Sequence, residues 1–185
     1  ATIAYNHFGN KLATLVAFNK AGLDEQVYKN VAMQVAAMNP IAVDECDVAE
    51  EVKEKEIAVA IEKTKAEQVQ KAVEAALKKA GINPAHVDSE DHMESNKAKG
   101  WITQEDVDKA KEIIATVSAE KAANLPEAMI QNIAKGRLGK FLKEVCLLNQ
   151  EDVTGEDKKT VRETLKAVDA ELSVLAFKRV NLNVD

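Results

Sequence analysis

A short segment near the middle of the chain gathers the residue types that hold metal ions. His86, Asp88, Glu90, Asp91 and His92 lie close together, and imidazole and carboxylate groups are common ligands of transition metals. Their spacing matches no established site, and the sequence offers no partner ligands elsewhere. We therefore interpret this segment as a solvated polar loop, and we expect no metal and no cofactor.

The two cysteines also suggest no chemistry. Cys46 and Cys146 lie far apart and outside any CxxC pattern, which argues against a zinc cage or a disulfide scaffold. A cysteine–histidine dyad would need a distant histidine to reach Cys146, whose apolar neighbours disfavour the thiolate. The sequence contains no GxGxxG, GxxxxGK[ST] or GxSxG pattern. We expect no catalytic residues, and a chain that is not an enzyme.

A basic run follows in a predicted helix, and it consists of Lys135, Arg137, Lys140 and Lys143. Such a run is either a solvated helix end that complements the helix dipole or a contact for an acidic partner. Gly136 and Gly139 interrupt the run, and each costs up to ~1 kcal/mol in a helix interior relative to Ala. We expect either a close approach of another backbone or a break in the helix at this pair.

Composition narrows the class of protein. The chain has 185 residues, 46% hydrophobic and 30% charged, with a formal net charge of −6 and a pI near 5.3. The acidic balance argues against a nucleic-acid or anionic-membrane surface, and no apolar run approaches the ~20 residues that span a bilayer. We expect a soluble, cytoplasmic protein. The chain starts without Met and enters apolar alternation at once, as a fragment would.

The N-terminal elements form a small α/β layer. Residues 2–8 and 11–19 are predicted strands joined by a turn at Gly9-Asn10. Residues 24–38 are a predicted helix, with Asp24 as its cap and Asn39-Pro40 at its end. In this helix Gln34 is the only polar residue from Val31 to Met38.

A long helical excursion follows. Residues 44–81 form a predicted helix with a narrow apolar seam, and residues 81–100 are predicted to form a loop. A second predicted helix begins at the Thr103/Asp106 capping pair. A third helix starts near Pro126. The seam of the first helix contains Val52, Ile57, Ile61, Val69, Val73 and Leu77. It fits either the returning helix of the same chain or another chain in a coiled coil.

The C-terminal segments complete an α+β protein. Residues 144–150 and 173–184 are predicted strands, and residues 158–172 are a predicted amphipathic helix. We therefore expect two small α/β subdomains with short antiparallel sheets and an inserted, coiled-coil-like helical hairpin.

Several motifs in order resemble the core of bacterial translation elongation factor Ts. They are KLATLVAFN (11–19), YKNVAMQVAAMNP (28–40), VAEEVKEKE (48–56), AKGRLGKFLKEVCLLNQ (134–150), TVRETL (160–165) and FKRVNLNV (177–184). The resemblance implies that residues 1–43 are the C-terminal part of the first core subdomain. Residues 44–62 and 126–185 are then the second subdomain with the base of the hairpin, and residues 63–125 are an extended hairpin.

The resemblance also implies a function. Such proteins are guanine nucleotide exchange factors, which bind the GTPase elongation factor Tu and promote GDP release by disturbing its magnesium and phosphate site. On the matching positions, Leu12, Ala13, Asn30 and Gln34 are the implied partner contacts. The alternative is a non-catalytic coiled-coil module, in which the hairpin mediates oligomerisation, for example a homodimer.

Three departures from the family pattern matter. Gln34 stands where many members have His, the family's N-terminal helical domain and T-D-F-V segment are absent, and the usual Q-P-F reads Gln150-Glu151-Asp152. We expect a fragment with reduced exchange activity. We also expect the core to bury Val31, Met33, Val35 and Met38, and the small residues Ala32, Ala36 and Ala37 to form a face that only the GTPase covers.

Overall fold

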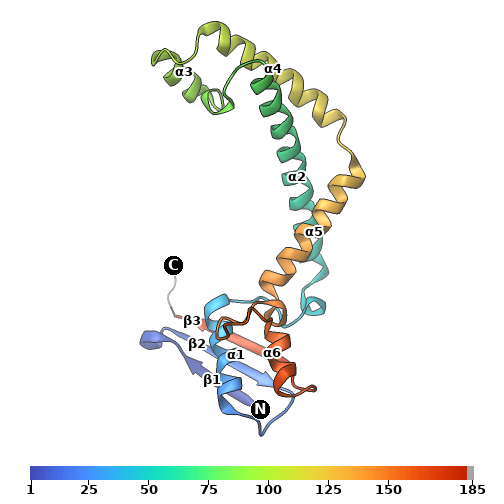
Figure 1. Ribbon diagram of the computed structural model, residues 1–185. Coiled ribbons are helices and arrows are strands. Elements are labelled where there is room, and N and C mark those ends of the chain that lie inside the picture. The colour runs from blue at the N-terminus through green and yellow to red at the C-terminus, as the bar shows by residue number, and fades with distance from the viewer. Residues whose placement is uncertain (183–185) are drawn as a thin grey trace. The chain divides into compact units, whose positions relative to one another are not determined.

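The computed structural model describes residues 1–182 (Figure 1). The chain divides into two compact units, one formed by Ala1–Lys55 with Leu138–Asp185, and the other by Glu56–Arg137. We call them unit 1 and unit 2. The α+β fold class is confirmed, since unit 1 carries a sheet with helices and unit 2 is helical.

Unit 1 is built on a single antiparallel sheet of order β1-β2-β3. β1 (Thr2–Asn6) and β2 (Leu12–Phe18) form the expected hairpin, with Gly9 at φ 75° in the connection. β3 (Val174–Asn181) pairs with the other edge of β2, and Leu15 faces Lys178 in this register. The expected strand at 173–184 is therefore confirmed over most of its length, and residues 183 and 184 lie outside the described residues.

The expectation of two separate sheets is wrong for the described residues, because β3 joins the N-terminal hairpin. The expected strand at 144–150 is also wrong. Helix α5 (Glu127–Val145) continues into this segment, Cys146 forms an isolated bridge with Ala42, and a 3-10 turn follows at Leu147–Asn149. A short apolar run suits a buried strand and a buried helix end equally well, so its pattern could not separate the two.

Helices α1 (Glu25–Met38) and α6 (Val161–Val168) contribute to the core of unit 1 together with the sheet. The Asp24 side chain caps α1 by accepting a hydrogen bond from the Gln26 N–H at 3.0 Å, and Asn39 ends the helix at φ 45°. Both ends were predicted. The core cluster is Val16, Phe18, Tyr28, Val31, Ala32, Val35, Leu147, Leu148, Val161, Leu165, Leu172 and Val174.

Unit 2 is the helical hairpin. It contains most of α2 (Glu50–Lys79), all of α3 (Glu90–Ala98) and α4 (Gln104–Ala123), and the first part of α5. A distal apolar cluster joins α2 to α3 and α4, with Val73 and Leu77 on the α2 side and Ile113 and Ile114 on the α4 side. The distal part of the α2 seam therefore packs within the chain.

The loop predicted at 81–100 is wrong over half its length. A 3-10 turn at Pro84–His86 precedes α3, which Ser89 caps by accepting from the His92 N–H at 3.1 Å. Only Met93 and Asn96 of α3 are buried. Two buried positions in nine residues give too weak a periodicity to distinguish a helix from polar loop.

The glycine pair of α5 meets neither expectation. α5 is continuous through Gly136 and Gly139, and a Cβ atom placed on either residue would meet no heavy atom within 4 Å. No close approach among the described residues accounts for them. Of the basic run, Arg137 contacts Glu67 of α2 through an ion pair. No helix in the described part of the chain is long and apolar enough to cross a membrane.

Candidate partner-binding surface on α1

The candidate chemical groups of the sequence do not assemble into a reactive site. Within residues 1–182, no group of three or more His, Cys, Asp or Glu side chains could hold a metal ion. His92 pairs with Asp88 one helical turn away. Cys146 is buried, and burial, with nearby Glu45 and Asp44, raises the pKa of its thiol to about 11. The interpretation of Cys146 as a core cysteine is confirmed.

Gln34 is the centre of a buried hydrogen-bond network. Its side chain is 1% exposed. Its Nε2 atom donates to Gln150 Oε1 at 3.2 Å and to the Glu151 carbonyl at 3.0 Å, while its Oε1 atom accepts from the Val153 N–H at 2.9 Å. A buried amide that satisfies both its donor and its acceptor stabilises the segment that it contacts.

Gln150 extends this network to two further elements. Its Nε2 atom donates to the Glu144 carbonyl at 2.8 Å, and its backbone carbonyl accepts from the Val161 N–H at 2.9 Å. Asp152, which is also buried, accepts from the N–H and hydroxyl of Thr154 at 2.8 and 2.6 Å. The segment between α5 and α6 is therefore fixed against α1 by its own backbone and by two glutamine side chains.

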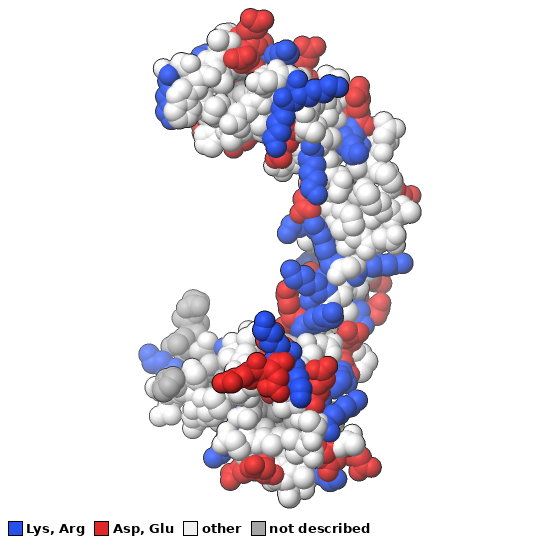
Figure 2. Space-filling model, in the orientation of Figure 1, with Lys and Arg blue, Asp and Glu red and all other residues white. Residues whose placement is uncertain are grey.

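Large apolar side chains are exposed on the C-terminal half of α1 and in the chain beside it. Met33, Met38, Ile41 and Val153 are between 37% and 56% exposed. Val153 lies beside α1 because its N–H donates to Gln34. In Figure 2 the surface over α1 is mostly white, with acidic side chains nearby. We call Met33, Met38, Ile41 and Val153 the α1 apolar surface. Exposed large apolar residues on and beside one helix make this region a candidate for an interaction site.

Two expectations about α1 are wrong in part. Val31 and Val35 lie in the core as expected, but Met33 and Met38 are exposed. Of the three alanines expected to form an open face, only Ala37 is exposed, and Ala32 and Ala36 are buried. The sheet covers both alanines, since Thr14 Oγ1 donates to the Ala32 carbonyl at 2.9 Å and Arg179 donates to the Ala36 carbonyl at 3.3 Å. The small side chains let the helix approach the sheet closely, which leaves the larger methionines outside.

The four residues implied as partner contacts do not lie on one surface. Ala13 and Thr14 point to opposite faces of the sheet, as neighbours in a strand must. Thr14 bonds to α1, so Ala13 lies on the face away from the helix and Leu12 on the α1 side. Asn30 lies on the outer side of α1, where its Oδ1 accepts from Gln26 Nε2 at 2.7 Å. Gln34 faces inward.

Asn30 borders a polar cavity of about 310 Å³ between α1, the segment 152–159 and α6. Asp152, Thr154, Lys159 and Thr164 also line it. This cavity lies on the same segment that presents Val153. The arrangement offers hydrogen-bonding groups next to an apolar surface, which is the combination found in protein interfaces, where a buried apolar centre meets a polar rim.

An ion pair holds the start of the 44–47 turn against α6. Arg162 Nη2 lies 2.7 Å from Asp44 Oδ1, and this hydrogen bond lowers the pKa of the Asp44 carboxyl. Arg162 also donates to Asn149 Oδ1 at 3.3 Å. These contacts fix the chain between α1 and α2 against α6, next to Asn149, which precedes Gln150 in the sequence.

The sequence did not predict Ile41 and Val153 as surface residues. Ile41 follows α1 and Val153 follows the 3-10 turn at Leu147–Asn149, and both lie in irregular chain, where periodicity carries no information about burial. Pro40 next to Ile41 was the only signal, since it ends α1 and turns the chain.

The fold and this surface define a small α+β protein with large apolar side chains exposed on and beside one helix. The family described as Elongation factor TS matches residues 1–80 and 57–183. The chain belongs to the elongation factor Ts family.

Relatives support this assignment. An elongation factor Ts of Bacteroides thetaiotaomicron is 76% identical over 186 residues, which cover all of this chain and 56% of that protein. The factor of Phocaeicola vulgatus is 71% identical, with 55% of its length covered, and that of Flavobacterium psychrophilum is 34% identical over 97% of this chain. The chain spans about half the length of the curated relatives that it matches.

Proposed function

We propose that this chain contributes to guanine nucleotide exchange on elongation factor Tu. Membership of the elongation factor Ts family carries the proposal, and the α1 apolar surface supplies a contact area. The chain would bind the nucleotide-free GTPase more tightly than the GDP-bound form. By thermodynamic linkage it would then weaken the binding of GDP by the same ratio. Exchange of this kind involves no covalent chemistry and would take place in the cytoplasm.

Within this proposal the predicted residues take different roles. Leu12, Ala13 and Asn30 are proposed contacts, while Gln34 positions Val153 and the cavity-lining segment instead of exposing its own amide. Docking of the factor would disturb the magnesium and phosphate site of the GTPase. The proposed division of the chain is residues 1–43, residues 44–62 with 126–185, and the hairpin 63–125.

Release of fluorescent GDP from elongation factor Tu tests the function. Micromolar chain should accelerate release, but less than a full-length relative does, because the chain covers only about half of such a protein. No acceleration together with no binding to elongation factor Tu in EDTA would contradict the proposal. Acceleration equal to that of a full-length relative would contradict the reduced activity.

A matched pair of variants tests the α1 apolar surface. Met33→Glu places a charge on it, whereas Val59→Glu places the same charge on an exposed position of α2 in unit 2. Binding to nucleotide-free elongation factor Tu should weaken at least tenfold for Met33→Glu, as for a central interface residue, and should not change for Val59→Glu. Equal effects of the two substitutions would remove α1 as the contact.

A further inference from the structure

A buried carboxylate lines the polar cavity of unit 1, which we call the Asp152 cavity. Asp152 is 8% exposed and shares the cavity wall with Thr154, Asp157 and Lys159. Its Oδ1 atom accepts both hydrogen bonds from Thr154, at 2.8 and 2.6 Å. Its Oδ2 atom has no hydrogen-bond partner among residues 1–182. Burial of a charged oxygen without a donor is costly, so this atom favours a ligand that donates to it.

The charges around the cavity leave Asp152 without a cation. Of the two carboxylates in the lining, Asp157 pairs with Lys159, whose Nζ atom lies 3.5 Å from Asp157 Oδ2. Asp152 forms no ion pair within the described part of the chain. Residues 151–159 carry four carboxylates and two ammonium groups, a net charge of −2. The cavity therefore attracts cations.

The lining suits a guanidinium group better than a metal ion. Within residues 1–182, no group of three or more His, Cys, Asp or Glu side chains could hold a metal ion. Polar oxygen atoms instead lie on three elements, since Asp152 belongs to the segment before α6, Asn30 to α1 and Thr164 to α6. A guanidinium presents several N–H donors in one plane and can serve several acceptors, whereas an ammonium is a compact point charge.

Apolar side chains at the cavity suit the stem of an arginine. Val168 lines the cavity and is 43% exposed. Arginine places its methylene stem on apolar surface while its charged head reaches polar groups. Val153, a member of the α1 apolar surface, directly follows Asp152. The cavity therefore continues the surface that we propose as the partner contact.

The backbone fixes Asp152 in place before any partner binds. Its N–H donates to the Lys159 carbonyl at 2.8 Å, and its carbonyl accepts from the Gly155 N–H at 3.3 Å. Two residues earlier, Gln150 is held by Gln34. A carboxylate that is already fixed reduces the entropy lost on association.

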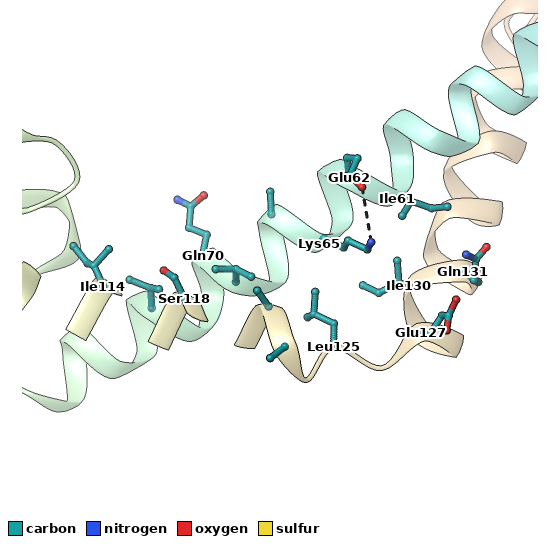
Figure 3. A pocket seen from close by; sticks show the side chains of 15 residues that line it. Ile61, Glu62, Lys65, Gln70, Ile114, Ser118, Leu125, Glu127, Ile130 and Gln131 are labelled. Atoms are coloured by element: carbon teal, nitrogen blue, oxygen red, sulfur yellow. Dashed lines mark ion pairs between the residues drawn. The ribbon is translucent and has the colours of Figure 1, made fainter. Parts of the chain in front are cut away.

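A wider groove in unit 2 lacks a comparable group. Its volume is about 880 Å³, and Figure 3 shows Leu125 and Ile130 reaching toward α2 from the junction of α4 and α5. On the α2 side, Lys65 pairs with Glu62 at 3.8 Å. The lining of this groove is mostly apolar, so it does not select one class of ligand. The Asp152 cavity does, because it presents a buried charge.

We propose, on the basis of the proposed function, that the Asp152 cavity receives an arginine side chain of the partner GTPase. The guanidinium would donate to Asp152 Oδ2 and to oxygen atoms of the lining, and its stem would lie on Val168. Asp152 would then contribute to specificity, because a partner without a cation at this place would leave the buried carboxylate unpaired.

A matched pair of variants tests Asp152 in the full chain. Asp152→Asn removes the charge and keeps an oxygen that can accept from Thr154. Glu156→Gln removes a charge from the same segment at an exposed position outside the cavity lining. Far-UV circular dichroism checks that both variants fold.

Binding to nucleotide-free elongation factor Tu should weaken at least tenfold for Asp152→Asn, mainly through faster dissociation, because the partner cation loses a buried anion. It should change about twofold or less for Glu156→Gln, since exposed charges contribute little. Equal losses for the two variants overturn the proposal, and so does unchanged binding of Asp152→Asn.

A small probe separates the cavity from the proposed function. Acetyl-arginine methylamide is titrated into the isotope-labelled chain while NMR follows the amide signals of Val153, Thr154 and Gly155. These signals should shift and saturate in the unaltered chain and stay unchanged in Asp152→Asn. Acetyl-lysine methylamide should bind several-fold more weakly than the arginine probe.

The two measurements fail in different ways. Saturation by the arginine probe without any binding to elongation factor Tu would contradict the proposed function and retain the arginine site. Binding to elongation factor Tu without saturation by the probe would retain the function and overturn the arginine site. An equal response of the unaltered chain and Asp152→Asn to the probe would also overturn it.

Discussion

Replacement of Gln34 by Ala tests whether this residue acts inside unit 1 or at its surface. The substitution removes three hydrogen bonds, to Gln150 Oε1, to the Glu151 carbonyl and from the Val153 N–H. A buried polar group left without a partner costs about 1–3 kcal/mol. The full penalty applies to the Oε1 atom of Gln150, because this residue is only 2% exposed. The penalty is smaller for the Glu151 carbonyl and the Val153 N–H, because both residues are exposed to water.

We therefore expect Gln34→Ala to lower the free energy of unfolding of unit 1 by about 2–3 kcal/mol. This is a large part of the roughly 5–15 kcal/mol by which domains are stable. Gln26→Ala is the matched control, because Gln26 is an exposed glutamine on the same helix. It should change stability by no more than about 0.5 kcal/mol.

Urea unfolding followed by far-UV circular dichroism measures these differences. Amide hydrogen exchange adds a local measurement, since the Val153 N–H should lose its protection in Gln34→Ala and keep it in Gln26→Ala. If Gln34→Ala retained full stability and full protection at Val153, the buried network would be refuted. A loss of binding to elongation factor Tu at unchanged stability would instead support a direct contact by Gln34, as the family resemblance implies.

Three further predictions concern α5, the cysteines and an ion pair. Gly136→Ala should stabilise α5 by about 0.5–1 kcal/mol, because alanine is favoured in helix interiors and the added Cβ meets nothing within 4 Å; a lower urea midpoint would contradict this. At pH 8, a maleimide should label exposed Cys46 and spare buried Cys146, whose thiol pKa of about 11 disfavours the thiolate; equal labelling in the folded chain would contradict it. The pKa of Asp44 is lowered from 3.8 by its hydrogen bond to Arg162, so this pair stabilises the fold above the unfolded pKa and the contribution is lost as pH falls through the lower folded value. Arg162→Met should therefore reduce stability at pH 7 more than at pH 2, and a pH-independent difference would show that the pair contributes nothing.

Both ends of α1 and the start of α4 could be predicted because the relevant contacts are local. The Asp24 cap, the left-handed Asn39 and the Thr103/Asp106 capping box each join residues within a few positions of one another. α3 could not be predicted, because its polar sequence forms a helix only where Met93 and Asn96 fit the distal cluster and the chain around it.

The candidate surface was predicted only in outline. The sequence indicated that α1 matters, but it assigned Met33 to the core and Gln34 to the partner, whereas the structure exposes Met33 and buries Gln34. An apolar helix without a polar face gives no phase from which to decide which side faces the sheet. The partner of Gln34 is Gln150, more than a hundred positions away, and no local pattern marks such a pair.

Sequence alone was enough to predict the α+β class, the hairpin of β1 and β2, the capped helices, the buried cysteine and the resemblance to elongation factor Ts. These depend on local propensities and on the order of motifs. Three features required the tertiary structure: β3 joins the N-terminal hairpin, Gln34 braces the segment of Val153, and the end of α2 packs against α3 and α4 in the distal cluster. Each of these depends on contacts between residues far apart in the chain, whose pairing is fixed by packing and hydrogen-bond geometry and not by the residues next to them.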